Sequence, residues 1–283
     1  MSKSILVGDI GSTKSSWYIS GDTNRHISLA GFNPLVQAPE VGMEMIDYLR
    51  HNLQDESPDT IWYYGTGVIE VQAADLVRKL LVASFPNSTI HISTDLEGAA
   101  RAACGKKAGT VAILGTGSHA AIFDGYHILR HANSLGYMLG DEGGGSDIGK
   151  TLAQAYFYNQ MPELVRVEMK KVLAGGRTEF LNALYSSPAP NQFLGEIAKV
   201  AVGLHDHTWI KELVTDRFSL FVKRHLVPLS PIGPVHILGS IGCIFAGLIE
   251  KELIHNGLKV GHFIQDPSYR LFEMHLEHDF NEK

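Results

Sequence analysis

Short apolar runs that end at a glycine alternate with longer amphipathic stretches over the first hundred residues. The runs are rich in β-branched and aromatic residues, which predicts strands. They cover residues 4–9, 16–20, 60–65 and 89–93. The longer stretches repeat apolar positions every three or four residues, which predicts helices. They cover residues 40–53, 71–85 and 96–104. Only a tight turn separates the first two runs, so an antiparallel hairpin is expected. Strands that alternate with helices predict an α/β domain.

The same pattern restarts near residue 110. Two strand-like runs flank a second glycine turn, and the hairpin dipeptide Asp124-Gly125 leads into a third run. The predicted strands are residues 110–114, 119–123, 126–129 and 235–238, and the predicted helical stretches are 146–226 and 243–255. This weak duplication predicts two domains, residues 1–106 and residues 107–283, the second with a helical insertion. The polar residues 267–283 have no predicted place.

Composition narrows the classes of partner. The net charge of −6 gives no electrostatic footprint for nucleic acid or for an anionic membrane surface. Only two cysteines are present, Cys104 and Cys243, and their separation gives no disulfide framework. The N-terminus lacks the apolar core of a signal peptide, and no apolar stretch is long enough to span a bilayer. We expect a cytoplasmic, soluble protein that would hold an anionic ligand with local backbone donors or a metal.

Two glycine turns between strands are candidate phosphate sites. Turns built from glycine and serine direct backbone N–H groups inward, and such a concavity binds anions. The first turn contains Gly11, Ser12, Thr13 and Lys14, and the second contains Gly115, Thr116, Gly117 and Ser118. Asp9, at the end of the first strand, suits Mg²⁺ held through water. Either turn alone is also compatible with a solvated hairpin, but a pair that opens both domains favours phosphate.

Two further segments have both a functional and an ordinary interpretation. Gly239-Ser240-Ile241-Gly242 lies between a strand and a helix, where it suits a nucleotide but is also a common turn. Asp95 follows a strand and precedes an alanine-rich helix. A carboxylate there is a candidate general base, whereas its spacing favours a helix N-cap, and both roles are compatible.

Residues 136–149 combine many glycines with three acids, which favours a functional loop over core. Residues 144–151 also match the phosphate-binding pattern G-x-x-x-x-G-K-[ST]. We interpret that match as coincidental, because no solid strand precedes it and Asp141, Glu142 and Asp147 would lie beside the phosphates.

The glycine- and acid-rich segments occur in the order found in the acetate kinase, sugar kinase, Hsp70 and actin superfamily. They most resemble the N-acetylglucosamine kinase branch of the BadF/BadG/BcrA/BcrD ATPase family, and residues 136–149 carry the most specific part of the resemblance. The resemblance implies an α/β fold with two ribonuclease-H-like (actin-like ATPase) domains that flank a nucleotide and sugar cleft. It also implies ATP and Mg²⁺ as cofactors. The implied reaction phosphorylates the 6-hydroxyl of an amino sugar such as N-acetylglucosamine, N-acetylmuramic acid or glucosamine.

The resemblance also implies roles for individual residues. Asp95 would be the catalytic base, and Asp9 would hold Mg²⁺ through water. ATP would be bound by Asp9, Gly11, Ser12, Thr13, Lys14, Gly115, Thr116, Gly117, Ser118, Gly239, Ser240 and Gly242. The sugar would be bound by Asn33, Thr66, Thr116, Gly117, Asp141 and Gly145. Pro34, Ala132 and Leu135 stand where mammalian members have histidine, cysteine and tryptophan, which leaves the 2-substituent of the sugar open.

Two other functions remain open at this stage. One is an ATPase activator of a radical dehydratase or reductase, which holds a [4Fe–4S] cluster with cysteines in glycine-rich loops. Cys104 and Cys243 fall in predicted helices and suit that role poorly. The other is a non-catalytic ATP- or sugar-binding regulator, which would fit if Asp95 is only a cap. The helical region 150–228 offers surface for a homodimer.

Overall fold

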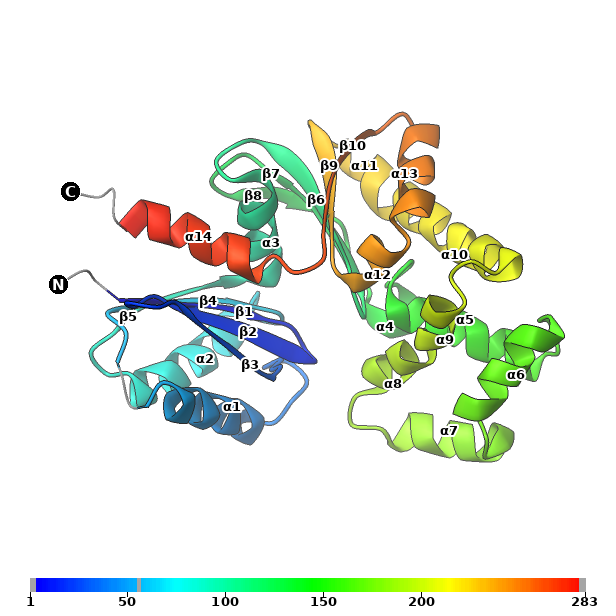
Figure 1. Ribbon diagram of the computed structural model, residues 1–283, viewed down its shortest axis with the longest axis horizontal. Coiled ribbons are helices and arrows are strands. Elements are labelled where there is room, and N and C mark those ends of the chain that lie inside the picture. Colours follow the sequence, from blue (N-terminus) through cyan, green and yellow to red (C-terminus); the bar gives the residue numbers. More distant parts are fainter. Residues whose placement is uncertain (1–3, 55–56, 280–283) are drawn as a thin grey trace. The chain divides into compact units, whose positions relative to one another are not determined.

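The computed structural model describes residues 4–54 and 57–279 (Figure 1). The chain divides into two compact units, each with one five-stranded sheet. The first unit contains residues 4–106, 125–127 and 266–279, and the second contains Lys107–Asp124 and Ile128–Gln265. Within the described ranges, no helix has the length and apolarity needed to cross a membrane.

The sheet of the first unit has the strand order β3-β2-β1-β4-β5. Its strands are β1 (Ile5–Ile10), β2 (Lys14–Ile19), β3 (Arg25–Ala30), β4 (Thr60–Gly65) and β5 (Thr89–Thr94). The first three are antiparallel because tight turns join them, whereas β4 and β5 run parallel to β1 because helical crossovers precede them. The crossover helices are α1 (Pro39–Asn52) and α2 (Val71–Ser84). The predicted antiparallel hairpin and the strands predicted at the positions of β4 and β5 are confirmed, and β3 is an additional edge strand.

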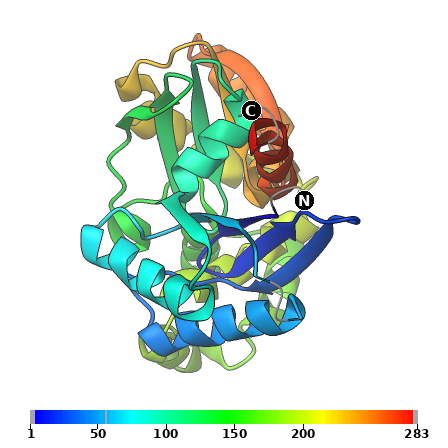
Figure 2. The same cartoon turned by 90° about the vertical axis from the view of Figure 1, so that its left-hand side faces the viewer.

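The two faces of this sheet are covered by different elements (Figure 2). Leu6 and Ile10 point to the side of α1 and α2, where they pack with Trp17 in the unit's main core. Ile5 and Val7 point to the other side, because successive side chains on a strand alternate. That second face is covered by α3 (Asp95–Cys104) and by α14 (Ser268–Asp279), the last helix of the structure.

Helix α14 belongs to the first unit, although the sequence left residues 267–283 without a place and grouped them with the second domain. Leu271 and Phe272 are fully buried against Ile5, Val7 and Tyr64. The Tyr64 hydroxyl also lies 2.9 Å from Nε2 of His275. Without α14, this face of the central strand would expose apolar residues to water. Burial of these residues is the physical reason why the end of the chain packs on the first unit.

The sheet of the second unit has the order β10-β9-β6-β7-β8, which repeats the order and strand directions of the first. Its strands are β6 (Gly109–Leu114), β7 (Ser118–Phe123), β8 (Ile128–His131), β9 (Pro234–Leu238) and β10 (Lys259–Ile264). This repeat is the ribonuclease-H-like arrangement that the sequence predicted, and the predicted fold class is confirmed. The sequence did not reveal β10, and β8 lies two residues later than predicted.

Between β8 and β9 the chain forms the helical region that the sequence predicted. Its helices are α4 (Gly136–Leu139), α5 (Gly145–Phe157), α6 (Glu163–Val172), α7 (Gly176–Ser186), α8 (Pro190–Ile197), α9 (Lys199–Gly203) and α10 (Thr208–Phe221). A π-helix η1 (Val222–Leu226) and α11 (Val227–Leu229) follow, and α12 (Ser240–Ile244) and α13 (Ala246–His255) lie between β9 and β10. One continuous core joins these helices to the sheet.

Candidate functional site

Three parallel strands of the first unit bring Asp9, Thr66 and Asp95 to one edge of the sheet. Asp9 is the penultimate residue of β1, Thr66 directly follows β4, and Asp95 directly follows β5. The register places Asp9 opposite Tyr64 and places Gly65 opposite Thr94, so the strand ends are level. The carboxyl ends of parallel strands are the usual place for ligands in sheets of this type. The structure therefore gathers the predicted base, the predicted Mg²⁺ residue and one predicted sugar contact.

Asp95 is not the N-cap of α3, contrary to what its spacing favoured. The cap is Thr94, whose hydroxyl oxygen accepts the backbone N–H of Glu97 at 3.1 Å. Asp95 is the first helical residue, and its carboxylate accepts the N–H of Leu96 at 2.8 Å and a hydrogen bond from Thr66. Because Thr94 performs the capping, the Asp95 carboxylate is available for chemistry. Burial raises the pKa of Asp95, and these hydrogen bonds offset only part of that rise.

Asp9 lies in a strongly anionic environment. Burial raises the pKa of Asp9 to about 7, with further increases from the Asp95 and Asp266 carboxylates, while Lys14 lowers it. Asp266 precedes α14 and accepts the backbone N–H of Ser268 at 3.0 Å. Sequence reasoning missed Asp266, because only the packing of α14 brings it to β1.

The donor set near Asp9 fits a magnesium ion bound mostly through water. Carboxylate oxygens are the ligands that Mg²⁺ prefers, and a nearby cation would relieve the repulsion that raises the pKa of Asp9. No cluster of three or more His, Cys, Asp or Glu side chains close enough to ligate a metal occurs in residues 4–54 and 57–279. A cation here would therefore keep several waters, as Mg²⁺ commonly does.

The first glycine turn is held by the segment that follows β3. The N–H of Gly11 donates to the carbonyl of Lys14 at 2.9 Å, and the N–H of Gly31 donates to the carbonyl of Thr13 at 3.0 Å. A Cβ on Gly31 would lie 2.1 Å from the carbonyl oxygen of Gly11, so only glycine permits this approach. Thr13 and Lys14 stay exposed at the tip of the turn.

Asn33 lies beside this turn. Its Oδ1 accepts the N–H of Leu35 at 3.0 Å, and its Nδ2 lies 3.5 Å from the Ser12 hydroxyl. Gly67, directly after Thr66, packs against the same side chain, since a Cβ there would lie 2.2 Å from Oδ1. The predicted sugar residues of the first unit, Asn33 and Thr66, thus lie in adjacent loops next to the predicted phosphate turn.

The second glycine turn is docked onto the N-terminus of α5. The N–H groups of Gly145 and Ser146 donate to the carbonyls of Gly115 and Thr116, each at 2.8 Å. Gly239, with φ of +99°, closes the other side of the turn, because a Cβ on it would lie 2.6 Å from the carbonyl oxygen of Leu114. The structure thereby brings Gly239, the first residue of the segment 239–242, against Leu114 and Gly115 at the start of this turn. A shared role of these residues in nucleotide binding stays a prediction.

Asp141 faces this turn from the glycine- and acid-rich loop. The N–H of Ser118 lies 3.5 Å from Oδ1 of Asp141, and a Cβ on Gly117 would lie 2.8 Å from Oδ2. Burial raises the pKa of Asp141, while the Ser118 N–H lowers it. The side-chain hydroxyls of Ser118 and Ser146 are buried and have no hydrogen-bond partner within residues 4–54 and 57–279. Proteins rarely leave such groups unpaired, so this site has unused capacity to bind a polar ligand.

Glu142, next to Asp141, is held by an arginine and a histidine that sequence reasoning missed. Its carboxylate accepts a hydrogen bond from Nη1 of Arg224 at 2.6 Å, and its other oxygen lies 2.7 Å from Nε2 of His225. Both partners lie on the π-helix η1, a local widening that frequently marks functional sites. Burial by itself raises the pKa of Glu142, but hydrogen bonds from His225 and Arg224 outweigh it and lower the pKa to about 2. The pair therefore fixes an ionised side chain beside Asp141.

The match to a phosphate-binding P-loop has no structural counterpart. Residues 144–151 are the start of α5, and the element before them is the short helix α4 rather than a strand. Lys150 is used within the unit, since Nζ donates to the Tyr137 carbonyl at 3.2 Å and lies 3.6 Å from Asp147.

The two cysteines lie in helices and suit a cluster poorly. Cys104 ends α3 and Cys243 lies within α12. Burial raises the pKa of both thiols, that of Cys104 to about 11. Metal clusters bind thiolates, so these positions oppose the role of iron–sulfur ligand.

The chain matches no protein-family model and no curated protein sequence. Among solved structures, a candidate N-acetylglucosamine kinase from Porphyromonas gingivalis is 28% identical, with a TM-score of 0.91 over 99% of this chain and 100% of that one. A candidate N-acetylglucosamine kinase from Chromobacterium violaceum is 16% identical, with a TM-score of 0.73 over 96% and 98% of the chains. A ROK family glucokinase from Streptomyces griseus, solved with glucose and AMPPNP, is 12% identical, with a TM-score of 0.60 over 93% of each chain. The chain has the two-domain α/β fold that these sugar kinases share with the actin-like ATPases.

Proposed function

We propose that the protein is an ATP-dependent sugar kinase that phosphorylates the 6-hydroxyl of an amino sugar, with N-acetylglucosamine the first candidate. The observation that carries the proposal is the Asp95 carboxylate, which Thr94 relieves of capping and which lies at the same sheet edge as Asp9. The similarity to the Porphyromonas gingivalis protein extends over nearly the whole of both chains and supports the same function.

In the proposed reaction, Asp95 accepts the proton of the sugar hydroxyl while the hydroxyl oxygen attacks the γ-phosphorus of ATP. The new bond is from that oxygen to phosphorus, and the bond that breaks joins the γ-phosphorus to the bridging oxygen, which leaves with ADP. A raised pKa makes Asp95 a stronger base near neutral pH than an exposed aspartate. Positioning and charge stabilisation supply most of the catalysis in phosphoryl transfer.

The remaining site residues have binding roles in this proposal. The nucleotide is held by the turns 11–14 and 115–118 together with Gly239, Ser240 and Gly242. Asp9 binds the magnesium of MgATP through water. Magnesium supplies charge neutralisation on the phosphates. The sugar hydroxyls are recognised by Asn33, Thr66, Thr116, Gly117, Asp141 and Gly145, because carboxylate, amide and hydroxyl groups bind hydroxyls directionally.

The test measures ADP release from MgATP with N-acetylglucosamine, N-acetylmuramic acid, N-acetylmannosamine, glucosamine and glucose. We expect one amino sugar to stimulate release, and Asp95→Asn to lower kcat by about 100-fold or more with nucleotide affinity retained. Asp75→Asn, which changes an exposed aspartate on α2, is the matched control and should match wild type. Phosphorus-coupled NMR of the product identifies the acceptor oxygen. Full activity of Asp95→Asn would remove the assigned base, and absence of stimulation by every sugar would contradict the kinase assignment.

A further inference from the structure

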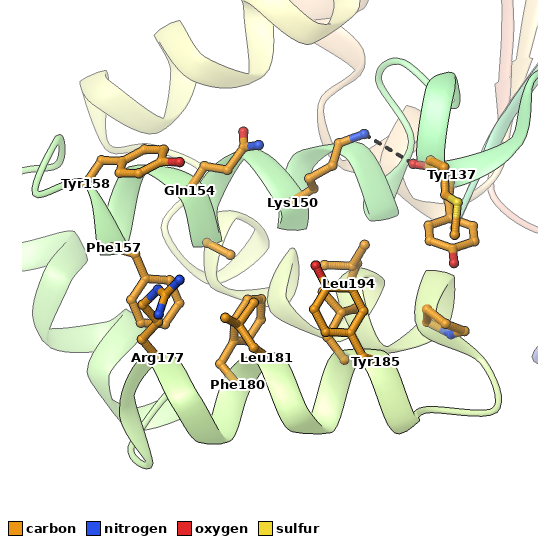
Figure 3. A pocket seen from close by; sticks show the side chains of 14 residues that line it. Tyr137, Lys150, Gln154, Phe157, Tyr158, Arg177, Phe180, Leu181, Tyr185 and Leu194 are labelled. Carbon is orange, nitrogen blue, oxygen red and sulfur yellow. Dashed lines mark hydrogen bonds between the residues drawn. The ribbon is translucent and has the colours of Figure 1, made fainter.

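A cavity of about 570 Å³ lies within the second unit, between α5 and α7 (Figure 3). Residues of α4 and α8 complete its walls. Its volume falls in the range of small-molecule sites, which is about 300–1,000 Å³. None of the residues that line it within the described chain belongs to the proposed ATP or sugar sites. The cavity is therefore lined by residues other than those of the proposed kinase site.

The walls of the cavity are mainly aromatic and aliphatic. Phe180 projects from α7 toward α5, and Phe157 projects from α5 toward α7 (Figure 3). Leu184 of α7 also lines the cavity. The Phe157 and Phe180 rings have centroids 5.2 Å apart and form a continuous aromatic surface. Helix α7 has no fully buried residue. Its Phe180 and Leu184 side chains are partly buried against the core and line this space with the rest of their surface. Such a surface favours an apolar ligand.

The polar groups at the cavity favour an anion. The lining contains Lys150 and Arg177 and no carboxylate, in a chain whose net charge is −6. Lys150 is partly neutralised by Asp147, at 3.6 Å. Arg177, at the start of α7, has no ion-pair or hydrogen-bond partner among the residues that the structure describes. Its guanidinium is thus available to a carboxylate, sulfonate or phosphate.

We propose that this cavity binds a small amphipathic anion. Its aromatic or short acyl body lies against the surface formed by Phe157 and Phe180, and its anionic group pairs with Arg177. A second copy of the chain or a protein segment would also cover these apolar side chains. A small anion is favoured over both, because only the small anion accounts for a cavity of ligand size together with an Arg177 guanidinium that is unpaired within the described residues. The proposal does not depend on the kinase activity, since it concerns other residues.

The probe for the test is 8-anilinonaphthalene-1-sulfonate, an amphipathic anion, titrated into the folded full-length protein with fluorescence detection. The neutral comparison is N-phenyl-1-naphthylamine, which has the same rings without the sulfonate. We expect saturable one-to-one binding of the sulfonate, weakened about fivefold by Arg177→Glu, the loss of one exposed ion pair. Neutral-probe binding should not change in that variant. Lys170→Glu on the exposed face of α6 is the matched charge control and should bind as wild type does. Leu181→Trp, which fills the cavity, should abolish binding of both probes.

Several results would overturn the proposal. These are absence of saturable binding, equal loss in Lys170→Glu and Arg177→Glu, and an Arg177→Glu variant that binds the sulfonate as tightly as wild type. Sedimentation provides a further criterion. A wild-type dimer that Leu181→Trp dissociates would show that a second copy covers the cavity, and this too would refute the small-molecule assignment. Circular dichroism of each variant establishes that it is folded.

Discussion

Replacing Glu142 by glutamine tests the most strongly perturbed carboxylate in the second unit. Glutamine keeps the size of the side chain but removes the charge that Arg224 and His225 bind at 2.6 and 2.7 Å. Glu142 is only 6% exposed, and the single carbonyl oxygen of glutamine can replace only one of the two carboxylate oxygens, so one of the two partners loses its acceptor. We expect the variant to fold with a lower free energy of unfolding at neutral pH.

The magnitude follows from the pKa of Glu142, which falls from 4.5 to about 2. Each pKa unit corresponds to about 1.4 kcal/mol, so the full shift corresponds to about 3 kcal/mol. The Arg224 side chain is 59% exposed, so solvent screens the part of the stabilisation that comes from its interaction with Glu142. This reduces the expected loss to about 2–3 kcal/mol. Because the folded state depresses the pKa, the stabilisation is complete above pH 5 and is lost as the pH falls from about 4.5 toward 2.

Urea unfolding of wild type and Glu142→Gln, followed by circular dichroism at pH 7 and at about pH 3.5, measures both features. The two proteins should differ at pH 7, and the difference should shrink at the lower pH. Glu163→Gln is the matched control, because that side chain is 81% exposed and lies at 4.0 Å from its partner. The control should change stability by no more than about 0.5 kcal/mol. A Glu142→Gln variant as stable as wild type at pH 7, or a difference that does not depend on pH, would refute the reasoning.

The other predictions concern Asp9 and the packing of α5. The folded state raises the pKa of Asp9 to about 7, so its contribution to stability is lost as the pH rises from about 4 through 7. Asp9→Asn should therefore stabilise the protein at pH 8 by about 1–3 kcal/mol and not at pH 4, measured by urea unfolding; equal effects at both pH values would argue against this. A Cβ on Gly149 would lie 1.9 Å from the Leu194 carbonyl oxygen, so Gly149→Ala should lower stability by about 1–3 kcal/mol. Gly247→Ala, where nothing lies within 4 Å of the new Cβ, should instead leave the melting temperature unchanged or raise it, and equal melting temperatures for the two variants would contradict the packing argument.

Local signals were sufficient for the central elements of both units. The strongest patterns belong to the long helices and to the strands β1, β4, β6 and β9, because each of them buries several apolar side chains. The turns were recognisable by their glycines. The edge strands β3 and β10 were missed, since no residue of β3 is fully buried and Ile264 is the one fully buried residue of β10. In β3 the alternation of Ile27 and Leu29 with polar residues was the available signal.

The candidate site was predictable where it is built from turns, and less so where it depends on packing. Gly115 was a candidate because it lies in a glycine turn between two strands, and Asp141 was a candidate because its glycine- and acid-rich loop resembles the kinase family. The binding roles of both residues stay predictions. Glu142 was visible in the same loop, but its partners on η1 are 82 and 83 residues away and carry no motif. Asp266 was missed for a similar reason, because the return of α14 to the first unit brings it to β1.

The position of α14 also constrains the order in which the protein can reach its native state during synthesis. A ribosome releases β1 through β5 long before it releases residues 268–279. While the entire second unit emerges, Ile5 and Val7 of the first unit therefore lack the Leu271 and Phe272 side chains that pack against them in the native state. The second unit is nearly contiguous in sequence, so it can form its own core during that interval. We therefore expect the second unit to fold before the first. A fragment that ends near residue 106 would therefore carry a persistent apolar face and should bind chaperones or aggregate, although it contains a complete five-stranded sheet.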